Sequence, residues 1–422
     1  MVVAIIATLL VYVIHQVDFL VAAVIVGAVI GAPIALKVPM TAVPQRTAMS
    51  HAFGSLAVAL VGAAEYYQDQ LSIIANKDYF TASVLCGEMV LGFLTFTGST
   101  IAFSKLQGIL PGRPFIYPAR IVVSLANLGI AVALSVYLIL NPSQTFVLPI
   151  IAAFALLFGF LLVIAIGGAD MPTVIAILNS FAGMSAAALG FVLDNKILIV
   201  AGSLDGSSGL VLAIIMSQAM NRSFLNILFG GLGATQKTTT VQGEARTVQG
   251  YAPEDVATIL ANANSVVFVP GYGMAVSQAQ HVVKELADTL QSRGIDVKYA
   301  IHPVAGRMPG HMNVLLAEAN VPYDQLYEMD RINPLFPETD VAIVVGANDV
   351  TNPAARTQKA SPLYGMPILD VDKAKTVVFI KRSTGPGFSG VENELFFLPN
   401  TMMVFGDAKK VLTELITAMK NQ

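Results

Sequence analysis

Residues 265–276 read Ser-Val-Val-Phe-Val-Pro-Gly-Tyr-Gly-Met-Ala-Val, an apolar strand-like run that ends in two glycines, Gly271 and Gly273. We expect a helix to follow directly, over 274–292. In a strand–turn–helix of this kind, glycines let backbone N–H groups and the helix N-terminus approach a pyrophosphate. The third small position of the pattern holds Val276 instead of glycine or alanine. The turn therefore suggests a dinucleotide site without establishing one.

The chain around this turn alternates between strand-like and helix-like runs. Further apolar strand-like runs lie at 297–304, 341–346, 376–380 and 401–405. Strands that alternate with helices are typical of an α/β domain with a mainly parallel sheet. Residues 252–422 are numerous enough to enclose a core of their own. The polar stretch 221–251 before them is expected to be a linker.

Polar residues stand at the ends of three predicted strands, where parallel sheets bind ligands. They are Gly306-Arg307-Met308, Asn348-Asp349 and Lys381-Arg382-Ser383. No carboxylate follows the second strand, where an NAD site would hold the ribose, whereas two cations and a hydroxyl can clamp a 2′-phosphate. The glycine-rich loop 385–390 could fold over the ligand. This favours NADP over NAD, although a basic pair solvated at a strand end remains the alternative.

The composition indicates that part of the chain lies in lipid. Of 422 residues, 55% are hydrophobic and 12% are charged, the mean hydropathy is +0.69, and residues 1–220 hold far fewer charges than the remainder. Runs near the ~20 apolar residues that cross a bilayer cover 2–14, 18–36, 47–64, 80–103, 119–140, 147–166, 172–193 and 197–220. We therefore predict an α-helical membrane bundle of about eight spans over residues 1–220.

Basic residues in the short connections indicate the orientation. With a cytoplasmic C-terminal domain and eight spans, the inside loops contain Lys37, Arg46, Lys105, Arg113 and Arg120. The outside loops contain only Lys77 and Lys196. We expect a multi-pass protein of the cell (inner) membrane whose nucleotide domain is cytoplasmic.

Several polar side chains lie in or beside the apolar runs, where a charge costs about 2.5–3.5 kcal/mol even on the gentler scales. They are His51, Glu88, Asp170, Asn179 and Asp205. Histidine can exchange a proton near neutral pH, and an amide or carboxylate on a neighbouring helix could hydrogen-bond it. Together these residues suggest a proton path. For His51 a satisfied interhelical hydrogen bond is an equal alternative, and for Glu88 and Asp205 a place near the membrane surface is favoured.

Other functions find less support. A net charge of −3 without a basic run excludes nucleic acid as the obvious partner, and the single Cys86 excludes a disulfide framework. We find no cluster with metal-ligand spacing and no nucleophile–base pair in the C-terminal half. The domain is expected to hold a hydride carrier whose chemistry belongs to the cofactor.

Longer motifs run in order along both halves of the chain. They are Thr-Phe-Thr-Gly-Ser (95–99), Gly-Gly-Ala-Asp-Met-Pro (167–172), Met-Asn-Arg-Ser (220–223), Gly-Tyr-Gly-Met-Ala-Val (271–276), His-Pro-Val-Ala-Gly-Arg-Met-Pro-Gly-His-Met-Asn (302–313), Gly-Ala-Asn-Asp (346–349), Lys-Arg-Ser (381–383) and Gly-Asp-Ala-Lys (406–409). With this order and extent, the sequence resembles the β subunit of proton-translocating NAD(P) transhydrogenase.

The resemblance implies that a separate α subunit binds NAD(H), while a Rossmann-like C-terminal domain of this chain binds NADP(H) and protons cross the bundle. It also implies a homodimer of α/β units. By motif, His51 corresponds to the family's membrane histidine, with Asn179 and Asp170 on its proton path. The implied cofactor-binding residues are Gly271, Tyr272, Gly273, Met274, Ala275, Val276, Gly306, Arg307, Met308, Asn348, Asp349, Lys381, Arg382, Ser383, Gly387, Phe388, Gly406, Asp407 and Ala408.

The chain departs from the family pattern in places. The family's β subunit usually has another span before residue 1, Phe388-Ser389 stands where Tyr-Ala is usual, and Arg331 stands where an acid is common. Two other classes share the same gross features. A transporter or channel with a redox-sensing nucleotide domain would usually have the missing strand-end acid, and an anchored NADPH-dependent reductase would need a flavin motif or substrate pocket.

Overall fold

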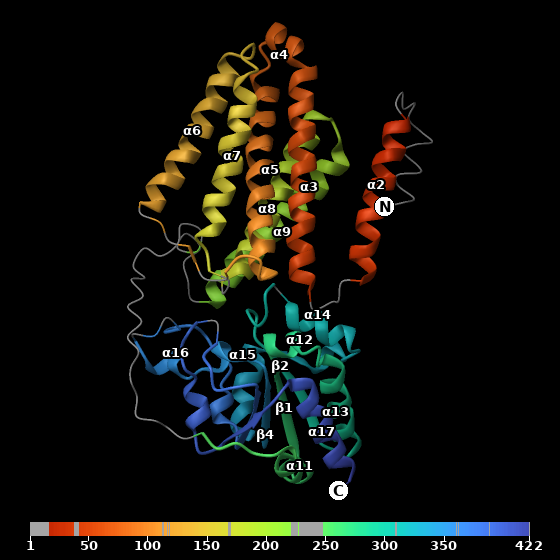
Figure 1. Ribbon diagram of the computed structural model, residues 1–422, viewed down its shortest axis with the longest axis vertical. Coiled ribbons are helices and arrows are strands. Elements are labelled where there is room, and N and C mark those ends of the chain that lie inside the picture. The colour runs from red at the N-terminus through yellow and green to blue at the C-terminus, as the bar shows by residue number, and fades with distance from the viewer. Residues whose placement is uncertain are drawn as a thin grey trace.

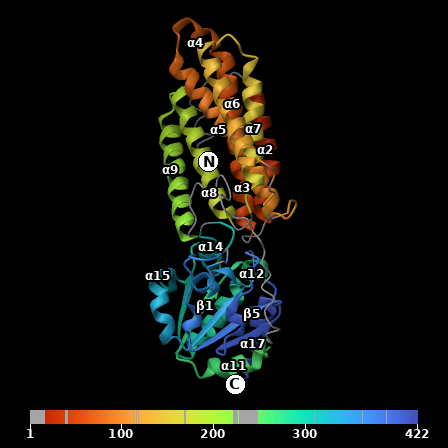
Figure 2. The ribbon, with the colours of Figure 1, turned by 90° about the vertical axis from the view of Figure 1, so that its left-hand side faces the viewer.

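The structure is a computed structural model, and most of the chain is described in it. The described residues are 17–37, 42–111, 114–115, 117, 119–167, 170–220, 227, 248–308, 310–359, 361, 363–387 and 389–421. They form a helical bundle and an α/β domain stacked end to end (Figures 1 and 2). Most of the predicted linker 221–251 lies outside the described residues.

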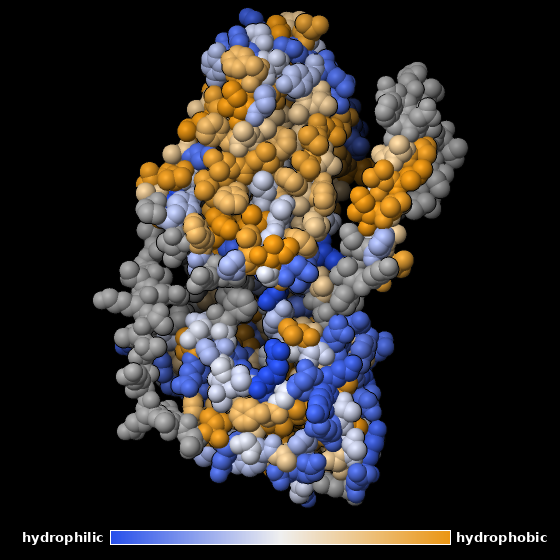
Figure 3. Space-filling model, in the orientation of Figure 1, coloured by the Kyte–Doolittle hydropathy of each residue, from blue (hydrophilic) through white to orange (hydrophobic). Residues whose placement is uncertain are grey.

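Six of the described helices are long and apolar enough to cross a membrane. They are α3 (Val43–Gln68), α5 (Tyr79–Leu106), α6 (Arg120–Leu140), α7 (Val147–Ile164), α8 (Met171–Val192) and α9 (Lys196–Ala219). The exposed surface of the bundle forms an apolar band, whereas polar side chains cover much of the α/β domain (Figure 3). These helices confirm six of the eight predicted spans.

The two N-terminal spans have a different outcome. Residues 2–14 lie outside the described residues. Helix α2 (Val17–Lys37) coincides with the second predicted span and contains Pro33. It stands apart from the bundle in Figure 1. The short helix α4 (Gln70–Asn76), at the end of the bundle far from the α/β domain, was not predicted.

Most of the basic residues assigned to inside loops lie in helices instead. Lys37 ends α2, Arg46 lies in the first turn of α3, Lys105 lies in the last turn of α5 and Arg120 begins α6, while Arg113 is outside the described residues. These helices extend beyond their most apolar cores and therefore include cationic residues in their terminal turns. The bias toward the side of the α/β domain remains.

Glycines bring the bundle helices into backbone contact. A Cβ placed on Gly183 of α8 would lie 2.3 Å from Gly206 N of α9, and one placed on Gly159 of α7 would lie 2.1 Å from Leu94 O of α5. Small residues allow such close approach within a membrane. The polar side chains on these helices are therefore held at short range.

The α/β domain has six parallel strands in the order β3-β2-β1-β4-β5-β6. The strands are β1 (Ser265–Pro270), β2 (Asp296–Ile301), β3 (Leu326–Glu328), β4 (Val341–Val345), β5 (Thr376–Lys381) and β6 (Thr401–Phe405). The prediction of a mainly parallel α/β domain is confirmed. Strand β3, only three residues long, was not predicted, and β2 ends three residues before the predicted run does.

Helical segments cover both faces of the sheet. One face packs against α11 (Pro253–Ala261), α13 (Gln280–Ser292), α14 (His311–Glu318) and α17 (Ala408–Lys420). The other packs against α15 (Met329–Ile332) and the 3-10 turns η4 (Asn333–Glu338), η6 (Val371–Lys373) and η7 (Glu394–Phe397). Remaining short elements are α12 (Tyr272–Val276), η3 (Tyr323–Gln325), η5 (Asp349–Thr351) and α16 (Ala354–Thr357). Two buried apolar clusters, one on each face, form the core.

The helix expected over 274–292 is two helices. Helix α12 ends at Val276, Gln278 adopts the left-handed conformation with φ 50°, and α13 begins at Gln280. The chain runs outward from β1 to β2 and β3, and from β4 to β5 and β6. A crevice is expected where the order reverses, at the carboxyl ends of β1 and β4. This edge of the sheet faces the bundle (Figure 1).

Candidate functional site

The turn after β1 packs backbone against backbone with the turn after β4. A Cβ on Gly271 would lie 2.3 Å from Ala347 Cα, and one on Gly273 would lie 2.6 Å from Gly346 Cα. Gly346 itself has φ +68°, a conformation that favours glycine. Gly271 N donates to Val345 O and Gly273 N to Gly346 O, both over 3.0 Å. The glycines thus bring the two strand ends together, and their own amides are engaged within the protein.

The other predicted residues of the first turn are divided between core and surface. Met274 and Ala275 are buried in the apolar cluster, whereas Val276 is 49% exposed. Tyr272 is partly buried and lies beside His311, with ring centroids 6.4 Å apart. Of Met274 and Ala275, only backbone atoms could contact a ligand at the crevice.

The glycine-rich loop folds against the end of β4. Ser389 donates to both carboxylate oxygens of Asp349, from its amide over 2.9 Å and from its hydroxyl over 2.8 Å. A Cβ on Gly387 would lie 2.3 Å from Asn348 Nδ2, and Asn393 Nδ2 donates to Asn348 O over 3.0 Å. The structure therefore brings these predicted residues together, while Phe388 lies outside the described residues.

The basic strand end lies beside the same loop. Lys381 Nζ donates to Gly385 O and lies 4.8 Å from the Phe396 ring centroid. Desolvation lowers the pKa of Lys381, and the charge of Asp349 opposes that shift. Arg382 and Ser383 are exposed. Two cations and a hydroxyl are thus grouped at the carboxyl end of β5.

The motif Gly406-Asp407-Ala408 has a structural role at the end of the last strand. Gly406 N donates to Lys381 O over 3.1 Å, which joins the end of β6 to that of β5. Asp407 caps α17 by accepting from Lys409 N and Lys410 N, and Ala408 is buried. Helix capping by an aspartate satisfies the first amides of the helix.

Arg307 connects the crevice to the membrane bundle. Its guanidinium lies 4.2 Å from the Tyr272 ring centroid, and its Nη1 donates to Leu106 O, at the end of α5, over 2.6 Å. Gln45 Nε2 of α3 donates to the same carbonyl over 3.3 Å. Desolvation lowers the pKa of Arg307, and it raises that of Tyr272, against the effect of the nearby guanidinium charge.

The loop that carries Arg307 is held by two buried histidines. Gly306 has φ +112°, and the Arg307 amide donates to His311 Nδ1 over 3.1 Å. His302 Nδ1 accepts from Val304 N over 3.2 Å, and its Nε2 contacts Pro367 O over 2.9 Å. Burial lowers the pKa of His302 to about 4. In these bonds both histidines contact the backbone of neighbouring loops, and Met308 is half-buried in the same loop.

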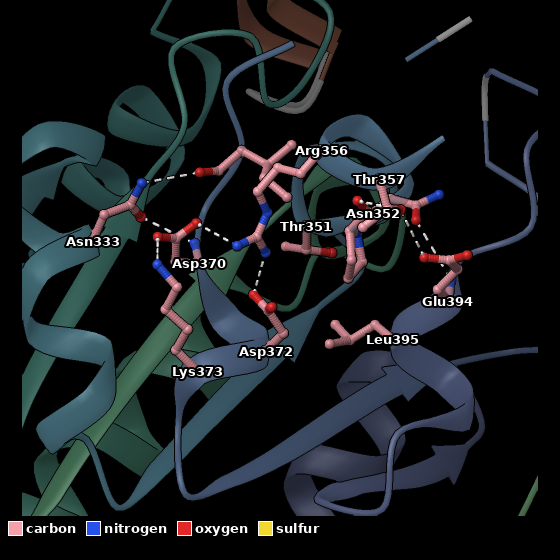
Figure 4. Close-up of polar contacts among 12 residues, drawn as sticks. Asn333, Thr351, Asn352, Arg356, Thr357, Asp370, Asp372, Lys373, Glu394 and Leu395 are labelled. Atoms are coloured by element: carbon pink, nitrogen blue, oxygen red, sulfur yellow. Dashed lines mark hydrogen bonds and ion pairs between the residues drawn. The ribbon is translucent and has the colours of Figure 1, made fainter. Parts of the chain in front are cut away.

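Polar contacts that sequence reasoning missed support the segment after Asp349 (Figure 4). Arg356 pairs with Asp370 over 3.4 Å and also with Asp372, and Lys373 pairs with Asp370 over 2.6 Å. Each partly exposed pair contributes little stability by itself. As a group they fix the path of the chain between β4 and β5. No short sequence motif indicates an ion-pair network whose members lie this far apart in the chain.

In the bundle, the structure brings His51 and Asn179 together. His51 on α3 interacts with the Asn179 side chain of α8 and with the charge of Asp205 on α9. Asn179 Nδ2 donates to Asp205 Oδ1 over 3.1 Å. Asp170, the residue before α8, is nine residues from Asn179 in the sequence, about 13 Å along a helix axis. Asp170 therefore lies about two and a half helical turns from Asn179.

Lys105, which was assigned to a loop, is buried at the end of α5. Its Nζ donates to Val163 O, Ile164 O and Ile166 O over 3.3, 2.7 and 2.6 Å. A cation at the C-terminal carbonyls of a helix is favourable. It thereby ties α5 to the end of α7 next to the carbonyl that Arg307 contacts.

Comparison with known proteins identifies the family. The family described as NAD(P) transhydrogenase beta subunit matches residues 1–418. The chain belongs to this family. Two Rhodospirillum rubrum proteins named NAD(P) transhydrogenase subunit beta, one from a specified strain, are each 51% identical over 426 residues, which cover 99% of this chain and 91% of each relative. The resemblance inferred from the motifs is confirmed, and the chain is the β subunit of a transhydrogenase.

Proposed function

We propose that residues 252–422 bind NADP(H), that residues 1–220 conduct protons, and that 221–251 link the two. Hydride transfer between NAD(H) and NADP(H) would then be coupled to proton movement across the membrane. The strand order supports a Rossmann-like fold, because parallel strands ordered 3-2-1-4-5-6 characterise dinucleotide-binding sheets. Family membership supports this enzyme over a channel that only senses redox state.

The residues at the carboxyl edge fit NADP(H). The turn 272–276 would contact the pyrophosphate, and Arg307 with its neighbours would line the cofactor. Asn348 and Asp349 would lie near the nicotinamide end, and Lys381 with its two neighbours would bind the 2′-phosphate. The grouping of cations with a hydroxyl at the end of β5 supports this assignment, since guanidinium and ammonium groups bind phosphate through charge-assisted hydrogen bonds. Bound NADP(H) would supply the hydride-carrying nicotinamide. The protein's own groups would bind and orient it.

His51 would hold the translocated proton inside the bundle. The side chain of Asn179 and the charge of Asp205 act on its ring, and Asn179 Nδ2 donates to Asp205 Oδ1. Nδ1 of His51 has no hydrogen-bond partner among the residues that the structure describes. This ring nitrogen is therefore available to take or release a proton.

One observation carries the coupling: Arg307 of the crevice and Gln45 of α3 donate to the same carbonyl, Leu106 O. Gln45 lies six residues before His51 on the same helix. A change of cofactor state that moves Arg307 would therefore alter the end of α5 and its contact with the helix that carries His51. Coupling of this kind acts equally in both directions.

The assembly and its location follow the same proposal. The NAD(H)-binding partner would be an α subunit that docks at the carboxyl edge, and two α/β units would form the complex in the inner membrane. With the basic helix ends inside, the α/β domain would be cytoplasmic.

The function is tested with the chain and its α partner reconstituted in vesicles. We expect hydride transfer from NADH to NADP to accompany proton flux, which a pH-sensitive dye reports. His51→Gln should stop both, while the detergent-solubilised complex should still assemble and bind NADPH. Ion flux that persists without hydride transfer would contradict the proposal and favour the sensor alternative.

A further inference from the structure

Glu88 is a buried carboxyl group in the middle of the bundle. It is 0% exposed on α5, although we expected a place near the membrane surface. Neither carboxylate oxygen has a hydrogen-bond partner among the described residues. Buried polar groups that serve only the fold are almost always hydrogen-bonded, and an ionisable residue inside a membrane generally marks a pathway for ions or protons.

The surrounding helices leave space for this carboxyl group by means of Gly62. A Cβ placed on Gly62 of α3 would lie 1.7 Å from Glu88 Oε2, so the carboxyl group lies directly against the backbone of α3. On the other side, Ser185 Oγ of α8 donates to Glu88 O over 3.0 Å. Tyr66 and Cys86 are buried in the apolar cluster that packs between α3 and α5. The Glu88 carboxyl group therefore sits where α3, α5 and α8 meet.

Two serines lie between the level of His51 and that of Glu88. Ser55 lies one turn after His51 on α3, is 2% exposed and has no partner for its hydroxyl among the described residues. A Cβ on Gly92 would lie 2.9 Å from Ser55 O and 3.2 Å from Ser185 Oγ. The backbone of Ser55 and the hydroxyl of Ser185 thus lie against the same point on α5, four residues beyond Glu88. Polar side chains of this kind can hold bridging waters.

The position along α3 gives Glu88 its role. Gly62 is eleven residues beyond His51, about 16 Å along the helix, and six residues before the end of α3, about 9 Å. A proton on His51 would otherwise have about 25 Å to cover along α3 before the far end of that helix. Glu88 divides that distance.

From this geometry we infer that Glu88 is a second proton-carrying group, which exchanges protons between His51 and the membrane surface opposite the α/β domain. The inference rests on the proposed proton path. In each cycle one carboxyl oxygen would accept a proton arriving from one side and release it to the other, through the serine hydroxyls and bridging water, with no net change at Glu88.

The test uses the complete α/β complex in vesicles. Glu88→Gln keeps the size of the side chain and removes its titration; Asp69→Asn, at the exposed far end of α3, is the matched control. We expect Glu88→Gln to slow proton flux about 100-fold, the usual contribution of a positioned proton-transfer group. The complex should still assemble and bind NADPH, Glu88→Asp should recover part of the flux, and Asp69→Asn should behave as wild type.

A spectroscopic readout separates proton transfer from packing. Infrared difference spectra between acidic and alkaline pH should contain a carboxyl C=O band that shifts in deuterium oxide and is missing in Glu88→Gln. Gly62→Ala, which displaces the carboxyl group without removing it, should slow the flux and add little to Glu88→Gln. Wild-type flux in Glu88→Gln, or slow flux with no band lost, would overturn the inference. A wild-type complex without proton flux would instead refute the proposed function itself.

Discussion

Replacing Arg307 by lysine should uncouple the nucleotide site from the bundle. In the structure, Arg307 Nη1 donates to Leu106 O over 2.6 Å while its guanidinium lies against the Tyr272 ring. A hydrogen bond from a charged donor contributes about 1.5–3 kcal/mol. Lysine keeps the charge but lacks the planar fork that can serve a carbonyl and a ring together.

The size of the effect follows from this contact. If the bond to Leu106 O forms in only one of the two coupled states, its loss removes about 1.5–3 kcal/mol of coupling free energy. This corresponds to a change of about 10- to 150-fold in the ratio of NADPH affinities with and without a proton gradient. The assay is an NADPH fluorescence titration of the complex in vesicles, with and without a proton gradient. Gln45→Ala removes a neutral 3.3 Å contact to the same carbonyl. It should reduce the coupling free energy by only about 0.5–1.5 kcal/mol. A wild-type ratio in an Arg307→Lys complex that still binds NADPH would refute this reasoning.

Two further predictions concern the α/β domain. Lys381→Gln should weaken NADP binding about 10- to 150-fold through loss of a charged hydrogen bond and leave NAD binding unchanged, whereas Lys375→Gln at the opposite end of β5 should alter neither; calorimetry of the complex checks this. The pKa of His302 is lowered from 6.5 to about 4, so the unfolded chain binds a proton that the folded domain excludes. Stability should be full above about pH 6.5 and fall by about 3 kcal/mol toward pH 4. In thermal unfolding, His302→Gln should flatten this slope; an unaltered slope would assign it to another group.

The features predicted correctly are those with a local physical cause. Apolar runs of sufficient length identify spans such as α3 and α8 without knowledge of their neighbours. The strands β1 and β4 are likewise continuous apolar runs, as expected for a parallel sheet buried on both faces. Lys381 could be assigned to a strand end because the run before it is so clearly apolar.

The features missed depend on distant parts of the chain. The amide of Gly273 was expected at a phosphate, but it donates to Gly346 O, more than 70 residues later in the sequence. The break between α12 and α13 requires Gln278 to adopt a positive φ, which no glycine marks. Lys105 was read as a loop cation because nothing local reveals the helix end that it caps. Such contacts become visible only after the helices are packed.

Helix α5 unites the two proposals. Glu88 lies on it between α3 and α8, and the helix ends at the carbonyl that receives Arg307. A helix transmits a displacement along its axis with little loss, because its backbone is a continuous hydrogen-bonded ladder. The buried Lys105 holds two carbonyls of the last turn of α7 and one just after it, so that end of α7 moves with α5. An axial shift of α5 would change the spacing at Glu88 and the bond to Arg307 together. Proton occupancy and cofactor state would thus be coupled through one helix, without a separate chain of side chains between the two sites.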